Sequence, residues 1–235
     1  MAWLTWINDS DLEKEVYLLL EKAQKAKSKS SKDFRKNVID PFAAIFEIAG
    51  FEQNFETWIR SEQSRQAQKT LQNHIGEFHQ NILGYCINWE NLSVGNVVDL
   101  VSIEHKIIAE VKNKYNTLSG GRLADQYATF DNLISPKLSV YKGYTAFLVT
   151  IIPQKRSRFN RTFTPSNKEK GERCPTNENI REIDGASFYS LVTGDPCALE
   201  NLYRILPSVI EKCTEGKIRL ADSDKLLEFY NAAFE

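Results

Sequence analysis

VGNVVDLVSIEHKIIAEVKN, residues 94–113, is the stretch that decides the fold. Two short runs rich in β-branched residues lie on either side of Glu104 and His105, which is the pattern of an antiparallel hairpin. If these two residues form the turn, Asp99 lies directly opposite Glu110 on the neighbouring strand. A connection one residue longer or shorter would shift that pairing, so the prediction depends on the length of the turn.

The predicted hairpin brings three reactive side chains to one face. Side chains alternate along a strand, so Glu110 and Lys112 share the face of Asp99. Their neighbours are apolar, and two carboxylates buried there need a positive partner. Oxygen ligands alone favour a hard cation such as Mg²⁺. The set suits phosphodiester hydrolysis, with Lys112 orienting or deprotonating the attacking water; the competing interpretation is a cross-strand salt bridge.

Helices are predicted ahead of the hairpin. Ser10 followed by Glu13 is a capping-box pattern that precedes an apolar run. Residues 41–59 predict a short helix and a turn. Residues 60–83 predict one long helix with a buried apolar stripe, and Gly84 suits its C-terminal cap.

The order of elements after the hairpin predicts the fold class. Residues 122–134 read as a helix, and the nearly all-apolar residues 144–153 read as a buried central strand. A further helix is expected from Asp195, and another over residues 224–234. We therefore expect an α/β fold with a central mixed sheet flanked by helices and a helical N-terminal region.

Composition limits the class of protein without identifying it. The chain has 235 residues and a net charge of −1, so overall charge gives no support for nucleic-acid binding. Its four cysteines have no zinc-ligand spacing, and the start lacks the features of a signal peptide. No stretch is apolar enough to cross a membrane. We expect a prokaryotic cytoplasmic protein with reduced thiols, divided into residues 1–59 and a core of residues 60–235 within one globular unit.

Two local segments are basic. Residues 153–173 hold seven Lys or Arg against two acids, with Phe159 and Phe163 interleaved, and residues 21–39 hold the same balance. The first is either a solvated loop or a DNA contact, in which lysines neutralise phosphates and arginines read guanines. The second is either a solvated helix end or a basic arm. The candidate DNA-binding residues are Lys155, Arg156, Arg158, Arg161, Lys168, Lys170, Arg173 and Arg181.

Several of these segments resemble one enzyme family. VVDLVSIEHKIIAEVKNKYNT, residues 97–117, resembles the active-site hairpin of PD-(D/E)xK type II restriction endonucleases, most closely the group that cuts GGNCC-type sites. QKTLQNHIGEFHQNILG, residues 68–84, resembles the helix that precedes that hairpin. FTPSNKEKGERCPTNENIREIDGASFYSLVTG, residues 163–194, resembles the C-terminal region of the same group. The residue before the first acid is Val98 and not the proline of the motif's name.

The resemblance implies a restriction-endonuclease-like core and a set of roles. Asp99 and Glu110 would bind Mg²⁺, and Lys112 would be the catalytic lysine. A further catalytic acid from the preceding helix is expected at Glu77. The remaining expected contacts to the DNA backbone are Asn113 and Lys114.

The expected enzyme is a homodimer on double-stranded DNA, because a twofold site is matched by two identical active sites. Its products would be 5′-phosphate and 3′-hydroxyl ends, and its companion a DNA methyltransferase that protects the host. Two alternatives stay open. One is a repair or junction-resolving nuclease of the same fold. The other is a non-catalytic DNA-binding protein, against which the intact Asp99, Glu110 and Lys112 set argues.

Overall fold

A computed structural model describes residues 2–93, 95–118, 120–167, 169 and 171–234. The helices are α1 (Asp9–Lys32), the 3-10 turn η1 (Phe34–Lys36), α2 (Pro41–Gly50), α3 (Phe55–Gly84), α4 (Gly120–Ile134), α5 (Gly185–Thr193), α6 (Ala198–Cys213) and α7 (Ser223–Phe234). The strands are β1 (Glu90–Asn91), β2 (Leu100–Ser102), β3 (Ile107–Lys114), β4 (Thr145–Ile152), β5 (Asn160–Thr162), β6 (Ser166–Asn167), β7 (Glu172–Arg173) and β8 (Ile180–Asp184).

The central sheet is mixed, as the sequence predicted. Its strand order is β1-β2-β3-β4-β8-β5, while β6 and β7 form a separate two-stranded ribbon. Strands β3, β4 and β8 are parallel, and the pairs β1–β2, β2–β3 and β5–β8 are antiparallel. The carboxyl ends of β3, β4 and β8 therefore lie along one edge of the sheet. The expected α/β fold class is confirmed.

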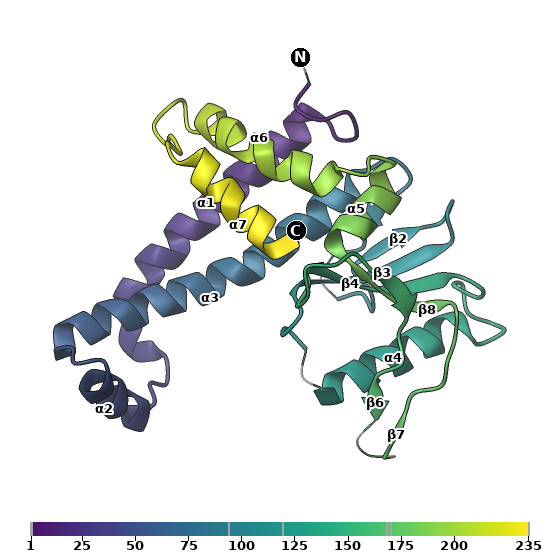
Figure 1. Ribbon diagram of the computed structural model, residues 1–235, viewed down its shortest axis with the longest axis horizontal. Coiled ribbons are helices and arrows are strands. Elements are labelled where there is room, and N and C mark those ends of the chain that lie inside the picture. Colours follow the sequence, from purple (N-terminus) through teal and green to yellow (C-terminus); the bar gives the residue numbers. More distant parts are fainter. Residues whose placement is uncertain (1, 94, 119, 168, 170, 235) are drawn as a thin grey trace.

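Helices cover both faces of the sheet (Figure 1). One apolar cluster contains Leu100 and Ala109 and joins the sheet to α1, α3, α5 and α6. A second contains Val101 and Ile108 and joins the opposite face to α4. Neighbouring residues of β2 and β3 thus belong to different cores, as the alternation of strand side chains requires. The hairpin is held from both sides.

The first helix differs from the prediction at its start. α1 begins at Asp9 with Asn8 as its N-cap, so Ser10 is inside the helix and not its cap. The backbone carbonyl of Asn8 accepts hydrogen bonds from the N–H groups of residues 11 and 12. Glu13 is occupied elsewhere, because its carboxylate accepts the indole N–H of Trp3 at 2.8 Å. A capping box was the wrong interpretation.

The long helix α3 starts earlier than predicted and ends differently. Asn54 caps it by accepting the N–H of Thr57 at 2.9 Å, so the helix begins at Phe55 and runs through the predicted division at residue 60. Gly84 is its last helical residue, and Tyr85 is the C-cap. A Cβ at Gly84 would lie 2.7 Å from the Cβ of Asn91. Glycine is therefore required by the close approach of β1 and not by the capping geometry.

Cys86, Cys197 and Cys213 carry free thiols. In the described part of the chain, no helix is long and apolar enough to span a membrane.

Candidate active site

The hairpin has the predicted register. Leu100 pairs with Ala109 and Ser102 pairs with Ile107, so continuing the ladder by one residue sets Asp99 opposite Glu110. The backbone N–H of Asp99 donates to the Ala109 carbonyl at 3.0 Å, which extends the pairing beyond β2.

The turn contains a residue with an unusual backbone conformation, and the first strand is shorter than predicted. Lys106 closes the turn with φ +53°, a conformation that non-glycine residues adopt at a modest energetic penalty. The first strand is shorter than predicted, because β2 spans only Leu100–Ser102. Val97 is 59% exposed, so the apolar surroundings expected on that side of Asp99 are only partly present.

Asp99 is held by the backbone of the opposite strand. Its Oδ2 accepts the N–H of Val111 at 2.7 Å. Burial raises the pKa of Asp99, whereas the hydrogen bond from Val111, the charge of Lys112 and a hydrogen bond from Gln80 act to lower it. The carboxylate is therefore fixed in orientation but incompletely compensated in charge.

Glu110 and Lys112 form a short ion pair on one face of β3. The Nζ of Lys112 lies 2.5 Å from Oε1 of Glu110, and their side chains are 23% and 14% exposed. Burial raises the pKa of Glu110, and the nearby charge of Asp99 raises it further, while Lys112 opposes both effects. The three groups thus interact, although the lysine pairs along its own strand and not across the hairpin. One ammonium is left to offset two carboxylates.

This donor set fits a hard divalent cation. Two half-buried carboxylates whose pKa values are raised gain from any positive charge placed between them. Among the described residues, no group of three or more His, Cys, Asp and Glu side chains is arranged to hold a metal. Mg²⁺ commonly binds through one or two carboxylates and keeps waters or substrate phosphates as its other ligands. A two-carboxylate centre meets that requirement.

The long helix contributes Gln80 near this centre, which the sequence reasoning missed. Its Nε2 lies 3.5 Å from the Val111 carbonyl, and its side chain also hydrogen-bonds to Asp99. Glu77, the acid expected from this helix, instead accepts from Lys22 at 2.7 Å and contacts His74 at 2.9 Å. Gln80 follows Glu77 by three residues on the helix, so helical spacing was the signal that could have found it.

The two residues that follow Lys112 are placed differently from each other. Asn113 lies on the α3 side of β3, because a Cβ on Gly76 would come within 3.9 Å of the Asn113 Cβ. The Oδ1 of Asn113 is buried and has no hydrogen-bond partner within the described part of the chain. Lys114 is exposed at the end of β3. Lys114 is therefore accessible to a DNA backbone, and Asn113 faces inward.

The basic loop begins at the same sheet edge as the ion pair. Lys112 pairs with Thr150 on β4, and Lys114 pairs with Ile152 immediately before the loop. Lys155 and Arg156 follow and are exposed. The carboxyl ends of two parallel strands thus bring the acids and this positive charge to one edge of the sheet.

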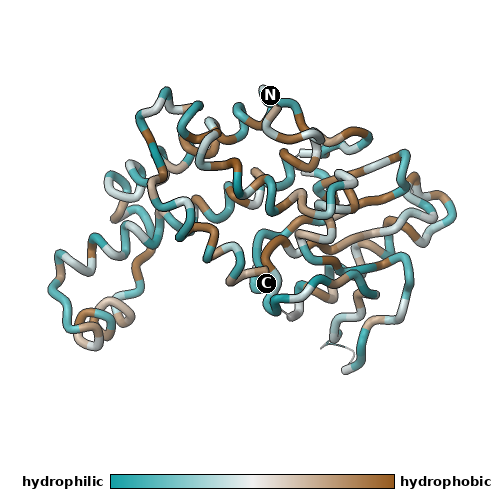
Figure 2. Tube along the Cα trace, turned by 45° about the horizontal axis from the view of Figure 1, so that its top comes forward, coloured by the Kyte–Doolittle hydropathy of each residue, from teal (hydrophilic) through white to brown (hydrophobic). Residues whose placement is uncertain are grey.

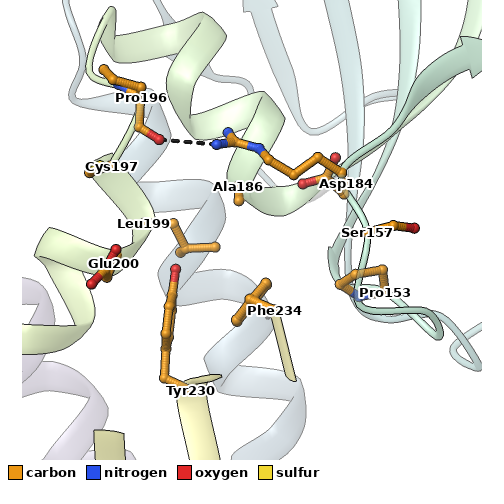
Figure 3. Close-up of a pocket in the computed structure, with 11 residues that line it drawn as sticks. Pro153, Ser157, Asp184, Ala186, Pro196, Cys197, Leu199, Glu200, Tyr230 and Phe234 are labelled. Atoms are coloured by element: carbon orange, nitrogen blue, oxygen red, sulfur yellow. Dashed lines mark hydrogen bonds between the residues drawn. The ribbon is translucent and has the colours of Figure 1, made fainter. Parts of the chain in front are cut away.

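Arg158 is hydrogen-bonded to groups beyond the sheet, and the dashed line in Figure 3 ends on the backbone oxygen of Pro196. Its Nη1 donates to the Pro196 carbonyl at 3.2 Å and its Nε donates to the Ser187 hydroxyl at 3.2 Å. The loop is fixed beside it, because buried Asp184 accepts the N–H of Phe159 at 2.6 Å and caps α5 through Ser187. Arg158 therefore helps to dock the loop on α5.

The arginines of β5 and β8 also have partners. Arg161 on β5 pairs with Glu182 on β8 at 2.6 Å and remains 67% exposed. Arg181 is only 24% exposed and donates to the side-chain and backbone oxygens of Asn160. Arg161 can exchange its surface partner for a phosphate or a base, whereas Arg181 holds β5 against β8.

The rest of the basic segment is divided between surface and core. Arg173 lies exposed on β7. Phe163, which is interleaved with the basic residues in the sequence, is buried in the core under α4 and contacts Tyr127. Lys168 and Lys170 lie outside the described residues.

The chain is similar in sequence to known type II restriction enzymes. Residues 4–215 match the family model described as Eco47II restriction endonuclease. The chain is 50% identical over 239 residues to the type II restriction enzyme Eco47II of Escherichia coli, with 100% of both chains covered. It is 28% identical over 219 residues to the type II restriction enzyme Sau96I of Staphylococcus aureus, covering 92% of this chain and 82% of the relative.

Proposed function

Because the chain belongs to the Eco47II restriction endonuclease family, we propose that it is a type II endonuclease that cuts duplex DNA at a short palindromic site containing GG and CC. Two relatives are named type II restriction enzymes, and they align with nearly the whole chain. The observation that carries the chemistry is the 2.5 Å contact between Lys112 and Glu110 beside the half-buried Asp99.

Asp99 and Glu110 hold Mg²⁺ in this proposal. Bound there, the ion supplies Lewis-acid stabilisation of the negative charge that builds up on the scissile phosphate. The Val111 N–H fixes Asp99, and Lys112 fixes Glu110, so both carboxylates are oriented before the substrate arrives. Lys112, whose ammonium is paired with Glu110, orients the attacking water and adds positive charge near the scissile phosphate. The products are a 5′-phosphate and a 3′-hydroxyl. Glu77 is kept as an accessory acid that must first exchange its contacts with Lys22 and His74.

The DNA lies along the sheet edge that bears the active centre. Lys114, Lys155 and Arg156 are exposed at that edge and neutralise phosphates. Arg161 and Arg173 are exposed on outer strands and are the candidates for reading guanine. Arg158, Arg181 and Asn113 shape the surface in this proposal, since their side chains already face protein groups. Lys168 and Lys170 remain candidate phosphate contacts from the sequence alone.

The proposed enzyme acts in the cytoplasm of a prokaryotic cell as a homodimer. A palindromic duplex presents two scissile bonds related by a twofold axis, which two identical active sites match. A cell that makes such an enzyme needs a DNA methyltransferase that modifies the same site.

The proposal is tested by incubating the purified chain with plasmid DNA and Mg²⁺ and sequencing the fragment ends. The expected result is a set of discrete fragments whose ends share a GG/CC boundary and carry 5′-phosphates. Chelation of the divalent ion should abolish the cutting. Intact plasmid under every divalent-ion condition, or a smear without a common boundary, would contradict the proposal.

A further inference from the structure

The short helix α2 exposes an apolar surface at the far end of the helices α1 and α3. Figure 1 shows α2 projecting away from the sheet, and Figure 2 shows hydrophobic stretches of the chain at this end. No described residue of α2 is buried. The arm tip, residues 38–55, has these exposed apolar side chains: Val38 (102%), Phe42 (72%), Ile45 (64%), Phe46 (73%), Phe51 (72%) and Phe55 (62%).

The helix is well formed although none of its described residues is fully buried. Asp40 caps it by accepting the N–H groups of Phe42 and Ala43 at 2.9 and 3.2 Å. Its base is anchored where the Trp58 indole N–H donates to Glu47 at 2.8 Å. Phe42 and Phe46 are four residues apart, so they share one face of a fixed helix. The apolar surface is therefore presented on a defined scaffold.

The area of the arm tip corresponds to one side of a stable protein interface. With about 200 Å² for each phenylalanine, the exposed parts of the four rings amount to roughly 550 Å². Val38 and Ile45 bring the apolar area toward the ~800 Å² that each partner contributes to a standard interface. The largest apolar patch of an ordinary monomer is only about 300–600 Å².

Charge identifies the kind of occupant. The arm tip contains three acids, Asp40, Glu47 and Glu52, and no Lys or Arg, so this surface repels the phosphates of DNA and of anionic lipids. The arm is formed by α1, η1, α2 and the start of α3. Its residues 21–39 contain seven Lys or Arg against two acids. When two copies are related by a twofold rotation, the acidic, apolar tip of each copy can face the basic residues 21–39 of the other.

We propose that the arm tip is the surface through which two copies of this chain associate. Phe42, Ile45 and Phe46 form the centre of the contact. The acidic residues around them face the basic residues 21–39 of the second copy. The inference deepens the proposed function and rests on it in one respect, since a palindromic duplex calls for two active centres in one particle.

The oligomeric state tests the inference directly, without DNA or Mg²⁺. Sedimentation equilibrium is measured for the wild-type chain, for Phe42→Glu/Phe46→Glu, and for Leu138→Glu. Leu138 is 98% exposed outside the arm and provides a matched control. We expect dimers for the wild type and the control, and a dissociation constant at least tenfold higher for the double variant. Circular dichroism should show equal helix content, because the two rings are not buried.

A wild-type chain that is monomeric at micromolar concentration would overturn the inference, as would a double variant as dimeric as the control. Double-strand cleavage is measured separately. The double variant should cut both strands at least tenfold more slowly at low protein concentration. Wild-type dimers that dissociate on substitution but never cut DNA would refute the proposed function and leave the interface standing. A double variant that stays dimeric and cuts normally would refute the interface and leave the proposed function standing.

Discussion

Replacing Lys112 by methionine removes one charge and keeps most of the length of the side chain, so it tests the ion pair with Glu110. The Lys112 Nζ lies 2.5 Å from a glutamate that is only 14% exposed. Without the lysine, Glu110 must either stay ionised beside Asp99 or take up a proton. At pH 7, protonation of a group with an ordinary pKa of 4.5 costs about 3.4 kcal/mol, at about 1.36 kcal/mol per pH unit. That value is the ceiling on the loss.

The loss should depend on pH in a fixed direction. Lys112 lowers a pKa of Glu110 that burial and Asp99 raise, so its removal raises the folded-state pKa further. A carboxyl group with a raised folded pKa keeps its full stability below the unfolded pKa and loses it as pH rises through the folded pKa. The variant should therefore match the wild type near pH 4.5 and be less stable by about 2–3 kcal/mol at pH 7.

Urea unfolding of the metal-free proteins at the two pH values measures this difference. Lys112→Met/Glu110→Gln is the control, because it removes both charges and should recover most of the lost stability while remaining unable to cut DNA. An equal loss at both pH values would refute the electrostatic reasoning. Wild-type cleavage by Lys112→Met would refute the catalytic role of the lysine.

Three further predictions concern the metal, the helix end and a buried histidine. Mg²⁺ should raise the melting temperature of the wild type and leave Asp99→Asn unchanged, since binding to the folded state alone adds stability; an equal rise in both would exclude Asp99 as a ligand. Gly84→Ala should destabilise the fold by about 1–3 kcal/mol in urea unfolding despite the better helix propensity of alanine, because the new Cβ would meet Asn91 at 2.7 Å; unchanged stability would refute that contact. Burial lowers the pKa of His79 to about 4 from 6.5, so the stability it contributes is present above pH 6.5 and is lost as pH falls toward 4. Between pH 4 and pH 6.5, the free energy of unfolding should change less with pH for His79→Gln than for the wild type. An equal pH dependence in the two proteins would contradict this.

The sequence predicted the centre of the fold because that centre is encoded locally. A two-residue connection and the alternation of residues 97–113 together determine the register of β2 and β3, and the structure has that register. The buried run of β4 was evident from its composition for the same reason. Strands of two or three residues, such as β1 and β5, have too few side chains to form a pattern and were missed.

The features that were not predicted depend on contacts with residues that are distant in the sequence. In the sequence, Gly84 has the position of a C-terminal helix cap, and only the structure shows that β1 approaches it closely. Phe163 lies in the basic, aromatic segment and Arg181 follows that segment, yet tertiary contacts place Phe163 in the core and pair Arg181 with Asn160. Glu77 has the right residue type for an accessory acid, but Lys22, 55 residues away, pairs with it.

The single-turnover rate of cleavage of a duplex bearing the mapped site is the most direct test of the centre formed by Asp99 and Glu110. It is compared for the wild type, Asp99→Asn, Glu110→Gln and the double variant, with duplex affinity measured in the absence of Mg²⁺. Residues that act as one unit give non-additive losses. We predict that each single variant binds the duplex but loses at least about a thousandfold in rate, and that the double variant loses little more. Either single variant cutting at the wild-type rate would contradict a shared two-carboxylate centre.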